Sequence, residues 1–388
     1  MRTFNVIIVG GGIGGAACAL RAAQHGLRLC WIRGDASTAK ASRARYVVNV
    51  DNMIGIHEGI GKKKLLEALS GPAHAAARAA IESVHFHIGT RDIVDNVEER
   101  LFREFPDRVT LIDEKAVLAR RDGALFTIAT SSGTELTAEA VILATGVMDR
   151  QPKVKRTTPN GKVVDEVHWI YPWANAETFL YCILCEGHLT RSAKVVVFGA
   201  SEAAAQVALM LHERSGASVT LLGNGEPLTA SEKTQRLLAA YGIGFRPERV
   251  VEVVDGGEKP KGSALGGLRL EDGTLVEARF AMVAMGLHRV YNDLARQLGA
   301  ELDPRDSLPD DQRHVLVDDV ASETSVRGLF AVGDMTRRRG DAPSLKQIYT
   351  AQEYAVRAVQ AIDRRVRAAR REEVLARTGA NTDPSRLT

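Results

Sequence analysis

The sequence lacks the features that mark a nucleic-acid-binding or a membrane protein. Its 388 residues carry a net charge of only +3, and no basic stripe interleaved with aromatic residues occurs in it. The apolar runs are short, and glycines soon break the one that starts at Val6, so the sequence predicts neither a membrane span nor a signal peptide. We therefore expect a cytoplasmic protein that binds no nucleic acid and no membrane.

Cysteine is scarce too, and only Cys18, Cys30, Cys182 and Cys185 are present. A reducing compartment disfavours structural disulfides, so the C-x-x-C pair Cys182/Cys185 indicates redox chemistry or metal binding. A zinc site would need two further ligands. His188 could supply one, but the sequence has no second C-x-x-C and no H-x-x-x-H. The pattern favours a redox dithiol that reacts as its thiolate, and we expect no metal.

Glycine, by contrast, is abundant, with 35 residues. The first cluster follows the apolar run Val6–Val9, precedes the alanine-rich segment Ala16–Gln24 and matches G-x-G-x-x-G. In this pattern Gly10 permits a tight turn, Gly12 lets the backbone approach a pyrophosphate, and Gly15 allows close helix–strand packing. The helix N-terminus then offers amide donors to the phosphates. The order strand, glycine turn and helix predicts a dinucleotide-binding domain.

Other strand ends predict further parts of the same nucleotide site. The strand expected at Arg28–Ile32 should end in an acidic residue that binds ribose, and Asp35 is the candidate. Two later apolar runs end in turns, which are Thr145-Gly146 after residues 140–144 and Gly333-Asp334 after residues 328–332. An aspartate at such a turn can accept hydrogen bonds from ribose or ribityl hydroxyls. We expect these turns to lie at a nucleotide.

A second strand–turn–helix pattern begins at Lys194–Phe198. Its glycine turn starts at Gly199, but Ser201 occupies the place of the middle glycine, which lets the backbone meet a pyrophosphate. The next strand ends in Gly223-Asn224-Gly225, which offers no arginine to a 2′-phosphate. We therefore expect a second Rossmann-like domain whose nicotinamide site is degraded.

The remaining segments carry weaker signals. Helices are expected from about Gly61 and over residues 345–365. Residues 85–112 are charge-rich and weakly periodic, and we interpret them as an insertion without assigned function. Prolines predict a linker over 152–173, whose aromatic residues at 169–173 form a lid or docking surface, or pack across a domain junction. Residues 366–388 are expected to be a flexible tail.

Taken together, these motifs resemble the low-molecular-weight thioredoxin reductases, within the FAD-dependent pyridine nucleotide–disulfide oxidoreductases. The resemblance covers roughly residues 4–365 and rests on five motifs in the family's order, with the dithiol just before the second nucleotide turn. It implies an α/β fold with two three-layer Rossmann-like domains, the second inserted into the first. The implied boundaries are 1–152 and 290–365 for the FAD domain and 175–285 for the NAD(P)H-type domain carrying the C-x-x-C.

The resemblance also implies roles for individual residues. FAD would lie over Gly10, Gly12 and Gly15. Cys185 would be the thiol on the flavin side, and Cys182 would attack the substrate disulfide. The other residues implied to bind FAD are Asn52, Gly333, Asp334, Lys346, Gln347 and Ile348.

Two residues beside the dithiol depart from the family pattern. Glu186 stands where the family has an aspartate that donates and accepts protons for the dithiol. His188 replaces an aromatic residue, and could either supplement that proton transfer or be a surface histidine.

The family resemblance also concerns the electron donor. NADPH-using members carry a His-Arg-Arg-like stretch where this chain has Gly223–Gly225, so the chain is more similar to the branch that uses ferredoxin, flavodoxin or a second FAD. Arg337–Arg339 would suit an acidic electron carrier or would form a solvated basic face. The substrate implied is a thioredoxin-like protein, and the implied assembly is a homodimer.

Three alternatives stay open at this point. The first is a thioredoxin reductase that does use NAD(P)H. The second is a dithiol oxidase of the same fold that passes electrons to oxygen, although such proteins tend to have histidine where this chain has Glu186. The third is a redox-sensing binding protein that keeps the flavin and the dithiol without turnover.

Overall fold

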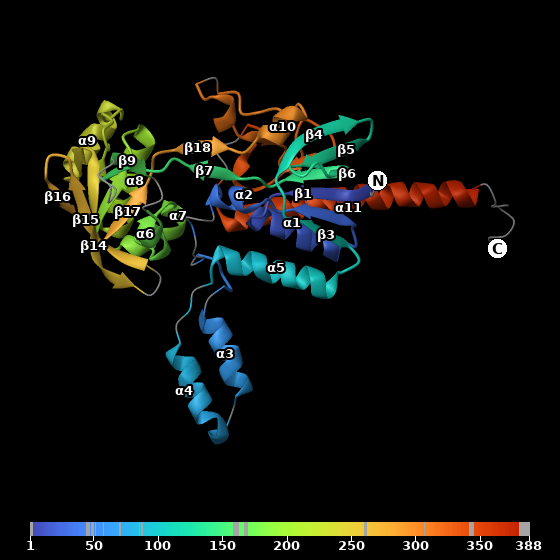
Figure 1. The fold of residues 1–388 in the computed structure, drawn as a ribbon, viewed down its shortest axis with the longest axis horizontal. Coiled ribbons are helices and arrows are strands. Elements are labelled where there is room, and N and C mark those ends of the chain that lie inside the picture. Colours follow the sequence, from blue (N-terminus) through green and yellow to red (C-terminus); the bar gives the residue numbers. More distant parts are fainter. Residues whose placement is uncertain are drawn as a thin grey trace. The chain divides into compact units, whose positions relative to one another are not determined.

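The chain folds into two compact units, which are labelled by element in Figure 1. The computed structural model describes residues 3–43, 47, 50, 52–56, 58–69, 71–84, 86, 88–157, 163–166, 170–259, 262–305, 307–340 and 345–379. The first unit contains Met1–Ser42, Asp92–Val147 and Val290–Thr388, and the second contains Arg43–Arg91 and Met148–Arg289. Residues 43–91 thus group with the second unit, whereas the sequence boundaries place them in the first. No helix among the described residues is long and apolar enough to cross a bilayer.

A seven-stranded sheet forms the centre of the first unit. Its parallel strands, in order, are β3 (Val109–Ile112), β2 (Leu29–Ile32), β1 (Thr3–Val9), β6 (Glu135–Leu143) and β20 (Leu329–Ala331). The first half of β6 also pairs with an antiparallel meander, β5 (Leu125–Thr130) and β4 (Ala116–Asp122). The central parts of β1, β2 and β6 are apolar and buried, as is typical of parallel strands whose two faces are covered.

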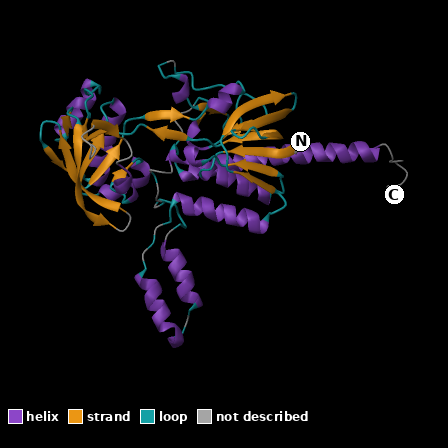
Figure 2. Ribbon diagram, viewed as in Figure 1, coloured by secondary structure: helices purple, strands orange, loops and turns teal. Residues whose placement is uncertain are grey.

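Three helices cover one face of this sheet, as Figure 2 shows. They are α1 (Ile13–Gln24), α5 (Thr90–Glu104) and α11 (Ile348–Gly379). The alanines of α1 allow it to approach both the sheet and α11 closely, and the large side chains of Trp31 and Tyr354 fill the remaining space.

Two expectations about the first unit were wrong. Most of the segment 85–112 is not an insertion, because α5 and β3 belong to this sheet and its helical layer. Val97 and Leu101 are buried on one face of α5, and its charged residues occupy the other. The flexible tail was also misplaced, since α11 remains helical to Gly379, and residues 380–388 lie outside the described part. Alanine, arginine and glutamate favour helix even without an apolar stripe.

The second unit is built on a parallel sheet of its own, which confirms the expected mixed α/β fold. Its order is β10 (Phe179–Leu180), β17 (Phe280–Val283), β11 (Lys194–Phe198), β12 (Ser218–Leu222) and β13 (Gly244–Arg246). Helix α8 (Glu202–Ser215) packs on this sheet and contacts α9 (Glu232–Ala240). A separate antiparallel sheet contains β14 (Val250–Lys259), β15 (Gly262–Leu270) and β16 (Leu275–Glu277).

The expected linker is more regular than its prolines suggested. It contains the antiparallel pair β8 (Val154–Thr157) and β9 (Val163–Glu166), then α6 (Tyr171–Asn175). Pro172 lies in the first turn of α6, where its missing N–H costs no helical hydrogen bond. Two of the four crossings between the units fall within β7 (Val147–Asp149) and β18 (Leu287–Val290), and the other two fall at 42/43 and 91/92. Trp169 lies outside the described residues.

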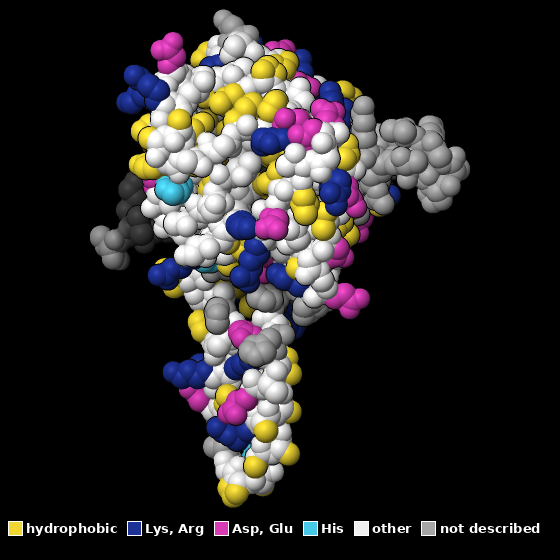
Figure 3. Space-filling view, turned by 90° about the vertical axis from the view of Figure 1, so that its left-hand side faces the viewer, with side chains coloured by type: hydrophobic (Ala, Val, Ile, Leu, Met, Phe, Trp, Pro, Cys, Tyr) yellow, Lys and Arg dark blue, Asp and Glu magenta, His cyan; other side chains and the backbone are white. Residues whose placement is uncertain are grey.

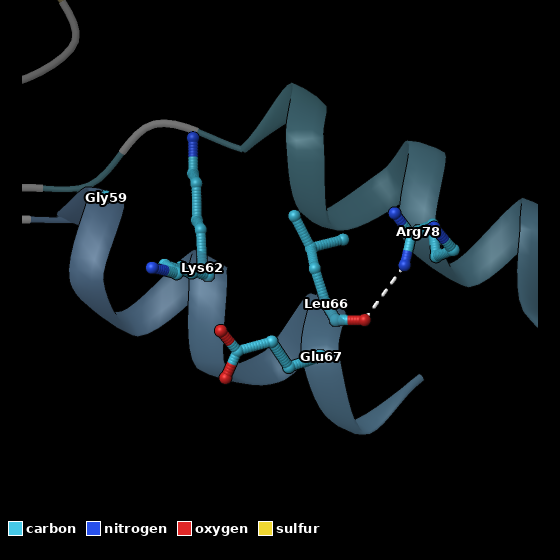
Figure 4. A pocket seen from close by; sticks show the side chains of 6 residues that line it. Gly59, Lys62, Leu66, Glu67 and Arg78 are labelled. Carbon is cyan, nitrogen blue, oxygen red and sulfur yellow. Dashed lines mark hydrogen bonds between the residues drawn. The ribbon is translucent and has the colours of Figure 1, made fainter. Parts of the chain in front are cut away.

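A helical hairpin precedes α5 and was only half expected. It consists of α3 (Glu58–Ala68), a 3-10 turn (Pro72–His74) and α4 (Ala75–Ser83), and none of these elements buries a residue. Arg78 of α4 donates to the carbonyl oxygen of Leu66 in α3 at 2.8 Å, across a groove shown in Figure 4. Basic, acidic and apolar side chains are mixed on the hairpin, the lower projection in Figure 3.

Candidate functional site

The two cysteines of the C-x-x-C motif form a disulfide in this structure. Their Cα atoms are 5.2 Å apart. Cys182 is the N-cap of the short helix α7 (Ile183–Glu186), and the N–H of Cys185 donates to the carbonyl of Cys182 at 3.1 Å. A single turn therefore brings the two sulfurs together. This turn directly follows β10, so the parallel sheet of the second unit holds the disulfide at the carboxyl end of an edge strand.

Glu186 is bound to the same turn. Its Oε2 accepts hydrogen bonds from the backbone N–H groups of Tyr181, at 2.9 Å, and Cys182, at 3.1 Å. Burial raises the pKa of Glu186 from 4.5 to about 7, although these hydrogen bonds and the positive charge of Arg43 act in the opposite direction. A carboxyl group with this pKa can both hold and release a proton near neutral pH. The proton-transfer role given to Glu186 remains a prediction, with this geometry in its favour.

The surroundings of the disulfide turn are well connected. The Tyr181 hydroxyl donates to Oε1 of Gln151 at 2.7 Å, and the Tyr181 side chain is buried. Arg43 forms a 2.8 Å ion pair with Asp149, and the side chains of both are only 15% exposed. These contacts all lie within the second unit. The Tyr181–Gln151 bond anchors the residue next to Cys182, and the charge of Arg43 acts on Glu186.

His188 is placed differently from Glu186. It lies in the 3-10 turn Gly187–Thr190 after α7, where its side chain is exposed. Among the described residues its imidazole has no hydrogen-bond partner. The structure thus ties Glu186 to the backbone of the disulfide turn and leaves His188 at the surface, so a proton-transfer role for His188 remains a prediction.

The glycines of the first turn meet different requirements. A Cβ at Gly10, whose φ is +131°, would lie 2.2 Å from the carbonyl oxygen of Ala144, and one at Gly15 would lie 1.9 Å from that of Gly10. Both positions therefore demand glycine for packing. A Cβ at Gly12, the N-cap of α1, would meet no described atom within 4 Å. The space above Gly12 is open, as close approach of a pyrophosphate requires.

The N-terminus of α1 suits an anionic ligand. No side chain caps this helix, and its first turn contains no acidic residue, so its free N–H groups and its dipole face that open space. Sheet pairing brings the other two turns close, because Val9 and Ala331 both pair with Leu143. The glycine turn, Thr145-Gly146 and Gly333-Asp334 therefore meet at the carboxyl edge of one sheet. This arrangement fits a dinucleotide such as FAD.

Thr145 uses its hydroxyl within the protein. Its Oγ1 donates to the carbonyl of Tyr291 at 2.5 Å, and the N–H of Tyr291 donates to the carbonyl of Gly146 at 3.0 Å. These bonds fasten the end of β6 to the segment after β18. A direct contact between Thr145 and the cofactor remains a prediction.

The end of β2 departs from the usual ribose site. Asp35 caps the short helix α2 (Ala36–Lys40), accepting from the N–H groups of Ser37 at 3.0 Å and Thr38 at 2.9 Å. The first residue after β2 is Arg33, whose guanidinium binds Asp113 through bonds of 2.8 and 2.9 Å. The Asp35 carboxylate is thus already a helix cap, and its proposed contact with ribose remains a prediction.

The residues expected beside the flavin ring lie at the start of α11. Ile348 begins this helix, and the carbonyl of Gln347 accepts from the N–H of Ala351 at 3.1 Å. Lys346 precedes them, and residues 341–344 lie outside the described part. Asn52 groups with the second unit, so the structure does not place it against the glycine turn. The cofactor contacts of these residues remain predictions.

The second glycine turn packs like the first one but differs from it at the position that would contact a ligand. Gly199, with φ +147°, packs against Ala204 and the carbonyl of Ala284 much as Gly10 packs against Ala144. Ser201, however, stands where Gly12 leaves open space, and its hydroxyl caps α8 by accepting from the N–H of Ala204 at 3.3 Å. The degraded fingerprint therefore lies at the position that would touch a pyrophosphate.

Glu202 adds a negative charge at this turn, which sequence reasoning missed. It is the first residue of α8, and its carboxylate accepts from the hydroxyl of Thr234 at 2.6 Å and the N–H of Ser231 at 2.7 Å. These bonds lower the pKa of Glu202 to about 2. The carboxylate thus stays ionised beside the helix N-terminus that would receive a dinucleotide phosphate. Its partners lie some thirty residues away in the sequence, so local spacing gave no signal for it.

The loop after β12 is closed by its own hydrogen bonds. Asn224 adopts a left-handed backbone with φ +50°. Its amide nitrogen donates to the carbonyl of Lys153 at 3.1 Å, and its amide oxygen accepts from the N–H of Val250 at 2.9 Å. The NADPH-using pattern would place arginine here, and Asn224 instead holds neighbouring backbone.

The arginines of the basic run Arg337–Arg339 are ion-paired within the first unit. Each arginine has an acidic partner, at 2.9 Å for Arg337 and Arg338 and at 3.0 Å for Arg339. Those partners are, in order, Asp303, Glu353 and Glu301. Asp303 also pairs with Arg305, and Glu353 also pairs with Arg357, so the cluster keeps an excess of positive charge. A docking role for this run remains a prediction.

Comparisons with known proteins agree with this architecture. The family model described as "Pyridine nucleotide-disulphide oxidoreductase" matches residues 4–355. A thioredoxin reductase from Streptomyces clavuligerus is 26% identical over 339 residues, covering 85% of each chain. The structure of thioredoxin reductase from Streptococcus pyogenes superposes with a TM-score of 0.67 at 19% identity, over 94% of this chain and 99% of that one.

The chain spans about half the length of other relatives. An alkyl hydroperoxide reductase component from Pseudomonas aeruginosa is 28% identical over 338 residues, which is 86% of this chain and 53% of that protein. The family match, in contrast, runs through both nucleotide turns, the disulfide and the Gly333-Asp334 turn. This chain belongs to the pyridine nucleotide-disulphide oxidoreductase family.

Proposed function

We propose that this protein is a FAD-dependent disulfide oxidoreductase that reduces the disulfide of a thioredoxin-like protein. The observation that carries the proposal is the Cys182–Cys185 disulfide, with Glu186 bonded to the backbone of Cys182 and titrating near neutral pH. Its relatives include proteins named thioredoxin reductase, which supports the choice of a protein disulfide as substrate.

In the proposed reaction, one electron pair passes through the Cys182/Cys185 dithiol to the partner disulfide. FAD, when bound, would supply the electron pair that reduces the Cys182–Cys185 disulfide. The Cys182 thiolate then attacks one sulfur of the partner disulfide, whose S–S bond breaks, and the departing thiolate takes up a proton. The Cys185 thiolate next attacks the Cys182 sulfur, which releases the second partner thiol. The partner gains two electrons, and the Cys182–Cys185 disulfide forms again.

Glu186 would act as the general acid and base of this exchange. With a pKa of about 7 it is roughly half protonated at neutral pH, so it can accept a proton from a thiol and return one to a departing thiolate. Its bonds to the N–H groups of Tyr181 and Cys182 keep the carboxylate at the dithiol turn.

The proposed electron donor is not NADPH. Three features support this choice: the Ser201 hydroxyl in the glycine turn, the ionised Glu202 beside it, and Asn224 where an arginine would hold a 2′-phosphate. The first two would also oppose the pyrophosphate of a second FAD. We therefore place a ferredoxin or flavodoxin ahead of a second flavin as the donor.

An anaerobic titration tests the donor. The flavin absorbance of the purified protein would be followed as NADPH, NADH or reduced ferredoxin is added. We expect bleaching by ferredoxin and none by either nicotinamide. Rapid bleaching by NADPH would contradict the donor proposal, and two flavins per chain would favour the second-FAD alternative.

The proposal extends to assembly and location. We propose a homodimer, as the family resemblance implies, and a cytoplasmic location. Light scattering of the purified protein measures the first, and a monomer would contradict it. Cell fractionation measures the second, and recovery of the protein outside the cytoplasmic fraction would contradict it.

A further inference from the structure

The residues around the disulfide differ sharply in exposure. Within 182–190, only Leu184 and His188 are exposed, and both cysteines are partly buried. Leu184 is 45% exposed although it lies between the two half-cystines. A single exposed leucine is ordinary on a protein surface, so its exposure by itself indicates nothing. Its position beside the reacting sulfurs is what matters.

The two residues between the cysteines have separate tasks. Ile183 packs against the core of the second unit, beside Gly187, where an added Cβ would come within 3.1 Å of the Ile183 side chain. Leu184 is not part of that core. Ile183 therefore anchors the disulfide turn, and Leu184 contributes little to that anchoring.

Disulfide exchange brings a protein partner, but not necessarily a small disulfide, against Leu184. The mixed disulfide requires a partner sulfur about 2 Å from the Cys182 sulfur. A folded protein that reaches this distance covers the neighbouring surface, since a specific interface involves about 20 to 30 residues a side. Leu184 is exposed and lies only two residues from Cys182, so an interface of that size around the Cys182 sulfur extends over it. A small disulfide can reach the sulfur without contacting Leu184.

We propose that Leu184 is the specificity-determining residue of this dithiol, selecting protein disulfides that are bordered by apolar side chains over small, polar disulfides. This inference rests on the proposed function, because it assumes that the reduced dithiol reacts with a protein. Burial of the leucine side chain against apolar atoms of the partner stabilises the complex. A partner whose disulfide is surrounded by charged or strongly hydrated groups would lose their hydration without gaining this apolar contact.

Single-turnover kinetics test this proposal on the full chain with its flavin. The protein is reduced with dithionite under anaerobic conditions, freed of excess reductant, and mixed with oxidised thioredoxin or with bis(2-hydroxyethyl) disulfide. The measured quantity is the ratio of the two second-order rate constants, thioredoxin over the small disulfide. For Leu184→Ala we expect this ratio to fall about tenfold, and Leu184→Met should restore most of it.

A matched variant controls for loss of any exposed leucine. Leu275 in β16 is 42% exposed and lies away from the disulfide turn in sequence, so Leu275→Ala should leave the ratio unchanged. An unchanged ratio in Leu184→Ala, or an equal loss of both rate constants, would overturn the specificity role while the proposed function stands. Wild-type protein that reduces the small disulfide and no thioredoxin would overturn both.

Discussion

The Glu186 carboxylate accepts a 3.1 Å hydrogen bond from the backbone N–H of Cys182, so a titratable group and half of the redox disulfide share one turn of chain. This carboxylate is partly buried at the end of α7, and burial raises its pKa to about 7. The proton and the sulfur that exchange chemistry requires are therefore supplied by residues four positions apart.

Replacing Glu186 with glutamine should change the pH dependence of disulfide exchange. The variant keeps an oxygen that can accept from the N–H of Cys182 but loses the group that titrates near pH 7. We expect the exchange rate to fall about 10² to 10⁴-fold at neutral pH and to lose its inflection near pH 7, because general acid–base catalysis is removed. Stopped-flow rates between pH 5 and 9 measure this. If the inflection near pH 7 persists in Glu186→Gln, another group causes it, which would contradict this role of Glu186.

The same residue should affect stability in a pH-dependent way. Folding raises the pKa of Glu186 from 4.5 to about 7, so the folded protein holds this proton more tightly than the unfolded chain. Its contribution is complete below pH 4.5 and is lost as the pH rises through about 7. The free energy of unfolding of the wild type should therefore fall relative to Glu186→Gln over that interval. Urea denaturation at pH 4.5 and 8 checks this, and a parallel course of the two curves would contradict it.

The Cys182→Ser variant should lose the reaction and keep the cofactor. Cys182 lies in the second unit, whereas the turns that fit FAD lie in the first, so we expect unchanged flavin absorbance with no measurable reduction of thioredoxin. The remaining Cys18 and Cys30 cannot substitute, since both are buried and burial raises the pKa of Cys30 to about 12. Reduction of thioredoxin by this variant would refute the dithiol mechanism.

Substitution of two glycines in the first turn should have two different effects, which are loss of FAD and loss of folded protein. Gly12→Ala places a methyl group in the open space above α1, so we expect a folded protein that has lost most of its FAD. Gly10→Ala brings a Cβ to 2.2 Å from a carbonyl oxygen at φ +131° and should reduce the folded yield itself. Flavin content and circular dichroism separate the two outcomes.

Gly14→Ala is the matched control for that experiment. Its Cβ would come no closer than 3.4 Å to a described atom, on a helical backbone that any residue adopts, so both fold and flavin should persist. Full retention of FAD in Gly12→Ala would remove the reason for placing the pyrophosphate at this turn.

A strained serine offers a stabilising substitution away from the sites. Ser322 is 1% exposed and has φ +59°, and its hydroxyl has no hydrogen-bond partner among the described residues. Glycine adopts this backbone without strain and removes the unpaired hydroxyl, so Ser322→Gly should raise the free energy of unfolding by about 1 kcal/mol. Urea unfolding at constant pH measures this, and a lower midpoint would show that the hydroxyl has a stabilising contact.

Local patterns were sufficient to predict much of this fold. The apolar run at Val6–Val9 became β1, the alanine-rich segment became α1, and the spacing of Cys182 and Cys185 predicted a bond that one helical turn does form. Each of these depends on residues close together in the chain. Sheet pairing then explains why turns near residues 10, 145 and 333 share one edge.

The features that were not predicted depend on contacts between residues far apart in the sequence, or lie in segments whose composition and apolar period indicate different structures. Many charges on α5 concealed a buried face with Val97 and Leu101, and the segment looked like an insertion. Glu202 shows no local sign of its bonds to residues of the segment before α9. The second half of α11 has the composition of a helix but lacks the apolar period that was used to find one.

The most direct test of the central claim is to trap the mixed disulfide. The Cys185→Ser variant keeps Cys182 but cannot complete the second exchange, so with a thioredoxin whose active-site disulfide is oxidised it should accumulate a covalent complex. Mass spectrometry of the digested complex should show Cys182 joined to one thioredoxin cysteine, and a reducing agent should release both proteins. Absence of the complex, or attachment through Cys18 or Cys30, would contradict the account.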